Sequence, residues 1–294
     1  MSAPGEFSNV EQPVVSEFNP ELGLVVKEES EIQKIVDVAV LMDGTGSMGY
    51  EMQAAAETMV SNVKILKSKY PNCVFRVAFV VYRDYDEPNE FVITEFTENV
   101  EELVSKLTKE RASGGNDACE NVAGGLARLL DLLWKGDICQ VFWVADAPAH
   151  GDRYHTASVS DNHRDGDRNG LDPEELFRRL ARKNIGVSFF KMNSTTDKMI
   201  DVLDAAYQGA RIPGNKANFI VADVSVQLSE AKAKAPHRVH YGGFDVMPAM
   251  EAEMGDEPYL MSRHPELNLF QSPSAEAYSE QFLAAVSSQM ADEE

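Results

Sequence analysis

Residues 36–59 read VDVAVLMDGTGSMGYEMQAAAETM, and this stretch decides the fold. It begins as a nearly unbroken apolar run, which is typical of a strand buried on both faces of a parallel sheet. A glycine-rich turn follows, and apolar residues then recur at three- and four-residue steps, which predicts a helix from about Ser47. Asp43 therefore stands at the carboxyl end of a central strand, where open α/β sheets bind ligands. The two glycines allow a tight turn that leaves the Thr45 and Ser47 hydroxyls on the side of the Asp43 carboxylate.

From Ile35 onward the chain alternates strand and helix signals as far as Val224. Strands are predicted at six places: Val36–Met42, Val74–Tyr82, Phe91–Phe96, Ile138–Ala145, Ile185–Phe190 and Phe219–Val224. Helical patterns lie between them, and three have the spacing of a capping box: Asn99 with Glu102, Asp117 with Glu120, and Asp172 with Glu175. The alternation predicts an α/β fold with a doubly wound, mostly parallel sheet.

Three regions are expected along the chain. Residues 1–30 are acidic and contain three prolines, which predicts a weakly structured arm. Residues 31–224 form the α/β domain, and residues 225–294 form an irregular extension that packs on the core. The extension ends in a helix, because apolar residues recur there at four-residue steps: Tyr278, Phe282, Val286 and Met290.

Composition narrows the partners. The 294 residues include 27 Lys and Arg against 48 Asp and Glu, and the net charge of -21 disfavours nucleic acid and anionic membranes, which need positive surface. Three cysteines without a paired motif are typical of a reducing compartment. The N-terminus lacks the pattern of a leader, and no stretch approaches a membrane-spanning length. We therefore expect a cytoplasmic protein without membrane insertion.

Two further acids are expected at the same edge of the sheet as Asp43. Asp146 ends the strand that should neighbour the first one, and Asp117 follows a glycine-rich loop on the carboxyl-end face. Three converging carboxylates repel one another unless a cation lies between them. Together with two hydroxyls they form a set of hard oxygen donors that suits Mg²⁺. The predicted ligands of Mg²⁺ or Mn²⁺ are Asp43, Thr45, Ser47, Asp117 and Asp146.

Other residues near this edge have less specific roles. Asp117 is also a good helix cap because of its pairing with Glu120, so both interpretations stay open. His150 is expected to pack a loop, since Mg²⁺ seldom takes imidazole. Tyr82 and Asp84 either orient the loops around the site or pack at the edge of the sheet.

The turn at residues 43–47, DGTGS, resembles the Asp-x-Ser-x-Ser motif of von Willebrand factor type A (vWA) domains, with Thr45 in place of the first Ser. Six motifs resemble, in order, those of the vWA domains of eukaryotic alpha-kinase-related proteins: VLMDGTGSM, VAFVVYRDYDE, GGNDACENV, VADAPAHG, DGDRNGLDPEEL and NSTTDKM. The resemblance spans about Ile35 to Val224. It implies a Rossmann-like sheet with helices on both faces, no catalytic chemistry in this domain, and a metal-ion-dependent adhesion site (MIDAS) whose ion is completed by an acidic residue of a partner.

The expected function is therefore a non-enzymatic, metal-dependent protein-interaction module in alpha-kinase-linked signalling. Integrin-type sites have a Thr where this chain offers Asn116 and Asp117. An extra carboxylate would weaken the pull of the ion on an acidic partner, which leaves the ligand preference open. The net charge of -21 also fits a partner with a basic surface. Residues after Val224 carry no kinase motif, which predicts no kinase activity for this chain.

Three alternatives remain. Residues 44–49, GTGSMG, match the dinucleotide fingerprint and would make the protein an NAD-dependent oxidoreductase, although Asp43 would then repel the pyrophosphate. A structural vWA module with a silent metal site is the second. Residues 165–170, DGDRNG, begin like a calcium-binding EF-hand loop, but Leu176 stands where the bidentate Glu is required. An acidic turn is therefore a better interpretation of residues 165–170 than a calcium site.

Overall fold

A computed structural model of the protein describes residues 17–19, 24–26, 33–107, 109–226, 239–241, 244–246 and 273–290. The chain divides into two units, Met1–Gln33 and Lys34–Glu294. The first contains an antiparallel pair of short strands, β1 (Glu17–Asn19) and β2 (Leu24–Val26). The remainder of the predicted N-terminal arm lies outside the described residues.

The second unit is built on a six-stranded sheet with the order β5-β4-β3-β6-β7-β8. The strands are β3 (Lys34–Asp43), β4 (Cys73–Tyr82), β5 (Phe91–Thr97), β6 (Ile138–Ala145), β7 (Ile185–Lys191) and β8 (Phe219–Asp223). All pair in parallel except β5, which runs antiparallel to β4. The six predicted strands are all present with nearly the predicted bounds, and β6 neighbours β3 as expected. The predicted α/β fold class is confirmed.

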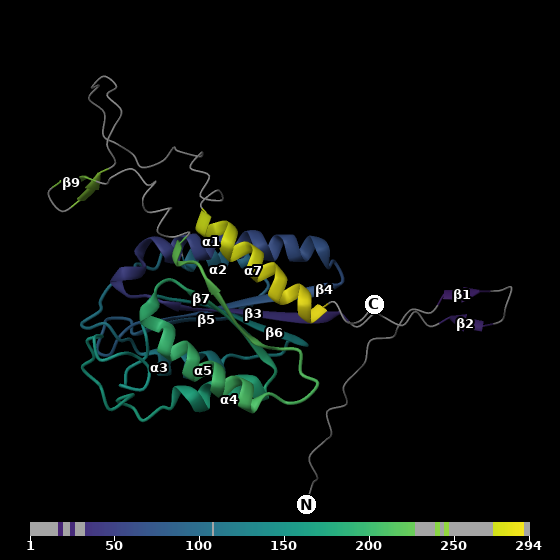
Figure 1. Ribbon diagram of the computed structural model, residues 1–294. Coiled ribbons are helices and arrows are strands. Elements are labelled where there is room, and N and C mark those ends of the chain that lie inside the picture. The colour runs from purple at the N-terminus through teal and green to yellow at the C-terminus, as the bar shows by residue number, and fades with distance from the viewer. Residues whose placement is uncertain are drawn as a thin grey trace, which may run out of the picture. The chain divides into compact units, whose positions relative to one another are not determined.

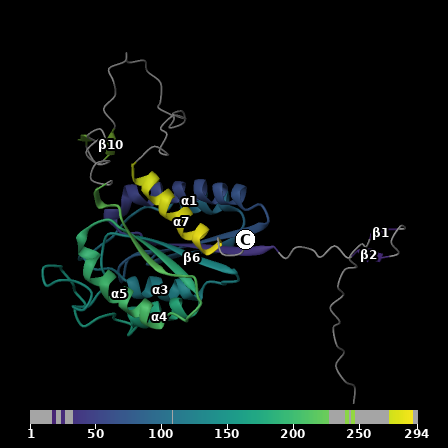
Figure 2. The same cartoon turned by 45° about the vertical axis from the view of Figure 1, so that its right-hand side comes forward.

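Helices cover both faces of this sheet (Figures 1 and 2). A short 3-10 turn, η1 (Gly46–Met48), leads into α1 (Gly49–Lys69), and a second, η2 (Ser194–Thr196), leads into α5 (Asp197–Ala210). The other helices are α2 (Val100–Leu107), α3 (Val122–Asp131), α4 (Pro173–Arg182) and α7 (Pro273–Met290). Helices α1, α2 and α7 pack on one face, and α3, α4 and α5 on the other.

The central strand β3 feeds both cores because side chains alternate along a strand. Val38, Val40 and Met42 belong to the cluster under α1, α2 and α7, whereas Ala39 and Leu41 belong to the cluster against α3, α4 and α5. All of them are at most 1% exposed. Because both faces of β3 are buried, neither face can expose a charged side chain to solvent. The two acids of β3, Asp37 and Asp43, therefore need other groups that compensate their charge.

The predicted helix caps are partly right. Asn99 Oδ1 accepts from the Glu102 amide, as in a capping box, but the Asn99 side-chain amide and not its backbone amide donates to Glu102 Oε2. Asp172 caps α4 by accepting from the Glu174 amide. The cap predicted at Asp117 is wrong.

Helix α3 begins later, at Val122, and is capped by Asn121. The Asn121 Oδ1 accepts from the Gly124 amide at 2.8 Å. The Asp117 Oδ1 instead accepts from the Cys119 amide at 2.9 Å, which closes a local turn and delays the helix.

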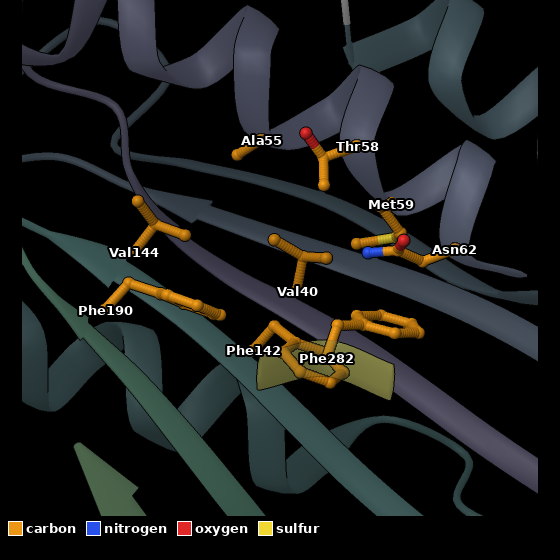
Figure 3. A pocket seen from close by; sticks show the side chains of 9 residues that line it. All are labelled: Val40, Ala55, Thr58, Met59, Asn62, Phe142, Val144, Phe190 and Phe282. Carbon is orange, nitrogen blue, oxygen red and sulfur yellow. The ribbon is translucent and has the colours of Figure 1, made fainter. Parts of the chain in front are cut away.

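The predicted C-terminal helix is confirmed as α7. Phe282 stacks on Phe142 of β6 with ring centroids 4.0 Å apart, and Val286 is fully buried. The Ser279 hydroxyl donates to Asn62 of α1 at 2.5 Å. Figure 3 shows the small, mostly apolar hollow that remains where Phe282 meets the sheet and α1. The helix thus completes one face of the core.

Most of residues 227–272 lie outside the described residues, so the predicted irregular segment stays a prediction there. The exceptions are two short antiparallel strands, β9 (Val239–Tyr241) and β10 (Phe244–Val246). Among the described residues, no helix combines the length and the apolar character that crossing a membrane requires.

Candidate metal centre

The carboxyl edge of the sheet gathers most of the predicted ligands. In the parallel register, Asp43 of β3 pairs with Tyr82 of β4, and Met42 pairs with Val144 of β6. Asp43 and Asp146 consequently leave adjacent strands at the same edge, as the sequence predicts.

The hydroxyls of the turn bridge these two acids. The Thr45 amide and hydroxyl both donate to Asp43 Oδ1, at 2.8 and 2.6 Å. The Ser47 hydroxyl donates to Asp146 Oδ1 at 3.0 Å and lies 3.5 Å from the Thr45 hydroxyl. Four of the five predicted ligands therefore form one connected set of oxygen donors.

The Asp43 carboxylate is incompletely satisfied. Its side chain is fully buried, and among the described residues its Oδ2 atom has no hydrogen-bond partner. Burial and the nearby Asp146 charge raise the pKa of Asp43 to about 7, although the bonds from Thr45 act in the opposite direction. One oxygen of this buried carboxylate has no hydrogen-bond partner among the described residues, and a second acid lies nearby. A bound cation would stabilise the negative charge of both acids.

Asp117 lies differently from the other predicted ligands. Its two oxygens accept from the backbone amides of Cys119, at 2.9 Å, and Asn162, at 2.6 Å. A carboxylate oxygen of Asp117 lies within 4.8 Å of donor atoms of Asp84 and His150. Its charge still reaches the metal centre, because it helps to raise the pKa of Glu120. Asp117 as a direct ligand stays a prediction.

Glu120 is the residue that the sequence interpretation missed. It is 3% exposed, its Oε2 atom has no hydrogen-bond partner among the described residues, and its side chain contacts the Thr45 hydroxyl. Burial and the charges of Asp43, Asp84 and Asp117 raise its pKa to about 10. The only sequence signal was its place three residues after Asp117, which the capping-box spacing explained in another way.

Backbone amide and carbonyl groups of the glycine turn already form hydrogen bonds within the chain. The Gly44 amide donates to the Tyr82 carbonyl at 2.8 Å, and the Gly44 carbonyl accepts from Ser113 at 3.1 Å. The Gly46 amide donates to the Gly114 carbonyl at 3.3 Å. A side chain on Gly44 would collide with Val81, which explains the glycine without a dinucleotide. Because the loop at Ser113 and Gly114 uses these backbone groups, they do not form an open phosphate cradle.

A buried histidine and aspartate network lies beside the centre. His150 is held between two acids, with its Nε2 2.8 Å from Asp84 Oδ1 and its Nδ1 2.8 Å from Asp161 Oδ1. Hydrogen bonds to these carboxylates raise the pKa of His150 against the opposing effect of burial. The network ties the end of β4 to the long loop after β6, which is the loop-packing role expected for His150.

The sequence that begins like a calcium loop forms a hydrogen-bonded turn. Asp167 accepts from the Tyr85 hydroxyl through Oδ1, and from the Asn169 and Leu171 amides through Oδ2. Both carboxylate oxygens therefore have donors within the chain, which favours the turn interpretation. The calcium site stays the weaker prediction.

Comparison with known proteins finds proteins that are similar to part of this chain. No family model matches the sequence. The alpha-protein kinase vwkA of Dictyostelium discoideum is 30% identical over 193 residues, which are 65% of this chain and 30% of the kinase. The putative ariadne-like RING finger protein R811 of Acanthamoeba polyphaga mimivirus is 31% identical over 130 residues, 44% of this chain and 12% of that protein. The chain thus spans less than a third of the length of either relative.

Proposed function

We propose that this chain is a divalent-metal-dependent protein-interaction module of the vWA type, which binds an acidic group of a partner through Mg²⁺ or Mn²⁺. The Asp43 carboxylate carries the proposal. It is fully buried, one of its oxygens has no partner among the described residues, and Asp146 lies near it. Such a carboxylate is costly to bury unless a cation accompanies it.

The residues that would hold the ion all offer hard oxygens at one edge of the sheet: Asp43, Thr45, Ser47 and Asp146. Glu120 adds a further candidate oxygen, and Asp117 stays a predicted ligand. When bound, the ion supplies positive charge that attracts a carboxylate of the partner. The two Thr45 donors fix Asp43 Oδ1 and leave Oδ2 available for the ion.

The partial match to an alpha-protein kinase supports a role in alpha-kinase-linked signalling. The sequence after Val224 carries no kinase motif, so we propose that this chain contributes interaction rather than catalysis. A cytoplasmic setting agrees with three cysteines that form no disulfide among the described residues.

Two alternatives predict different results. An NAD-dependent oxidoreductase predicts that NADH quenches the fluorescence of Trp134 or Trp143, and the engaged backbone of the glycine turn counts against it. A structural module with a silent metal site predicts that partner capture is unaffected by a chelator.

Affinity capture from an extract of the source cell tests the proposal. Wild type and Asp43→Asn serve as baits, each with excess Mg²⁺ or with EDTA, and retained proteins are quantified by mass spectrometry. We expect a set of proteins that wild type retains only with Mg²⁺ and that Asp43→Asn does not retain. Equal retention in Mg²⁺ and EDTA would overturn the proposal.

A further inference from the structure

A second group of metal-ligating side chains lies apart from the Asp43 centre. Cys119 precedes α3, and His155 and Asp161 belong to the loop between β6 and α4. The Cys119 sulfur, a His155 ring nitrogen and an Asp161 carboxylate oxygen lie within 4.8 Å of one another. Their exposed fractions are 0, 1 and 9%, respectively. Thiolate, imidazole and carboxylate are the ligands that zinc takes in proteins, with bonds of about 2.0 to 2.3 Å.

The supporting contacts of a zinc site are already in place. The His155 Nδ1 lies 3.0 Å from the Thr156 carbonyl, so Nδ1 carries the proton, while Nε2 faces Asp161 Oδ2 at 2.8 Å. Asp161 Oδ2 also accepts from the Gly151 amide at 2.8 Å, and Asp161 Oδ1 accepts from the His163 amide at 2.7 Å and lies 2.8 Å from His150 Nδ1. The ion would therefore replace the contact of Oδ2 with His155 and leave the other contacts in place. Metal-bound histidines commonly donate their second N–H to a carbonyl, and metal-bound carboxylates accept further hydrogen bonds, in this way.

The thiol provides a second observation. No hydrogen bond of the Cys119 sulfur is found among the described residues, although the sulfur is fully buried beside Asp161 and Asp117. Burial and these acids raise the pKa of Cys119, so the metal-free thiol is neutral and is not an activated nucleophile. Free cysteines are common in protein cores, but this thiol also lies within reach of a histidine and an aspartate, and the three together form a donor set that zinc takes.

The loop that carries two of these ligands is long and irregular. Residues 146–172, between β6 and α4, contain no helix or strand, yet Tyr154, His155 and Asp161 from this segment are buried. Loops of this length without secondary structure are uncommon in compact domains, and the ordered ones usually have a functional role. A metal ion bound by Cys119 and by this loop would join it to the segment before α3.

We propose that Cys119, His155 and Asp161 supply three ligands of a Zn²⁺ ion, which leaves its fourth position to water. The ion bonds to His155 Nε2, Asp161 Oδ2 and the Cys119 sulfur in place of the direct contact between His155 and Asp161. The Cys119 thiol proton and any proton on Nε2 pass to solvent, and no redox change occurs. The site is distinct from the Asp43 centre in its donors, because it combines sulfur and nitrogen with oxygen, whereas the Asp43 centre offers oxygen alone.

Cobalt substitution tests this proposal in the full chain. Chelator-treated wild-type protein is titrated with Co²⁺ in excess Mg²⁺, and absorption is recorded. A cysteine ligand gives a sulfur-to-cobalt charge-transfer band in the near ultraviolet, and tetrahedral coordination gives intense visible bands. We expect both to saturate at one equivalent and to disappear when Zn²⁺ is added. A wild-type protein without the charge-transfer band would overturn the proposal.

Variants assign the band to its ligands. Cys119→Ser should lose it, and Cys139→Ser is the matched control, because Cys139 is also buried but donates to the Gly136 carbonyl. Persistence of the band in Cys119→Ser would overturn the assignment. If Cys119→Ser does not fold, Cys73→Ser and Cys139→Ser assign the band by elimination: retention in both supports Cys119, and loss in either contradicts it. Asp43→Asn should keep the band, which separates this result from the fate of the proposed Mg²⁺ centre.

Discussion

Asp37 and Asp43 stand near opposite ends of the same strand, and both are fully buried. Asp37 has a complete set of donors: Arg76 binds it through two nitrogens at 2.8 and 2.6 Å, and the Lys135 and Gly136 amides each donate at 2.7 Å. Asp43 receives two bonds on one oxygen from Thr45 and none on the other among the described residues. The two carboxylates are equally buried, but they differ in the groups of the chain that compensate their negative charge.

The difference separates a structural acid from a candidate ligand. At the amino edge the chain supplies its own cation, the Arg76 guanidinium, and the charge of Asp37 is neutralised internally. At the carboxyl edge the neighbours of Asp43 include Asp146 and Glu120. The Thr45 bonds and the Arg83 charge offset these acids in part, but no ion pair with Asp43 is found among the described residues. We propose that a cation from solution compensates the charge there, as Arg76 does at the other edge.

The largest effect is expected from Asp37→Asn. It leaves the largely buried Arg76 guanidinium without its carboxylate, and such a loss typically costs about 3–5 kcal/mol of unfolding free energy. Urea unfolding measures this loss, which should be equal with Mg²⁺ and with EDTA. A loss that Mg²⁺ abolishes would show that the two acids do not differ as described.

The next effect is stabilisation by Mg²⁺ itself. An ion that binds only the folded state, at a concentration of one hundred times its Kd, raises the unfolding free energy by about 2.7 kcal/mol. Wild type should show this increment in urea unfolding and Asp43→Asn should not. An increment that survives in Asp43→Asn would place the ion elsewhere.

The pH dependence should follow from the raised pKa values of Asp43, about 7, and Glu120, about 10. Above pH 5 the metal-free folded state holds protons on these groups that the unfolded state has released. Stability must therefore fall as pH rises, more steeply below pH 7 than above it, by at most roughly 1.4 kcal/mol per pH unit for each proton. Unfolding between pH 5 and 9 measures the slope.

Mg²⁺ should flatten this slope, because the ion replaces the protons. A metal-free protein whose stability rises across that range would contradict the assigned environments of Asp43 and Glu120.

The smallest expected effect is a gain in unfolding free energy for Asp43→Asn without metal, whereas Asp37→Asn should lose unfolding free energy. In EDTA, Asp43→Asn replaces a poorly compensated buried charge with a neutral amide, whose oxygen can keep the Thr45 bonds. We expect a gain of about 1 kcal/mol in unfolding free energy, against the general tendency of substitutions to destabilise. A loss as large as that of Asp37→Asn would mean that the Asp43 charge is compensated by the chain.

The sequence was sufficient to predict which elements and turns bring Asp43, Thr45, Ser47 and Asp146 to one edge of the sheet. The strands of the sheet are apolar runs bounded by turn residues, and parallel pairing then forces Asp43 and Asp146 to one edge. The turn after β3 is local, so the approach of Thr45 and Ser47 to Asp43 follows from five consecutive positions, 43–47. Local patterns and parallel topology together predicted these contacts.

The parts that were missed come from irregular loops. Glu120 enters the centre because the chain around it forms a turn, and because α3 begins only at Val122. The His150 and Asp161 contact joins residues of one loop that has no periodicity to read. Side-chain placement in such loops depends on tertiary hydrogen bonds, which a single sequence does not encode as a spacing.

Calorimetric titration of Mg²⁺ or Mn²⁺ into metal-free wild type and Asp43→Asn tests the central claim most directly. The account predicts saturable binding at one site in wild type and no binding at that site in Asp43→Asn. Equal binding in the two proteins, or none in wild type, would contradict it.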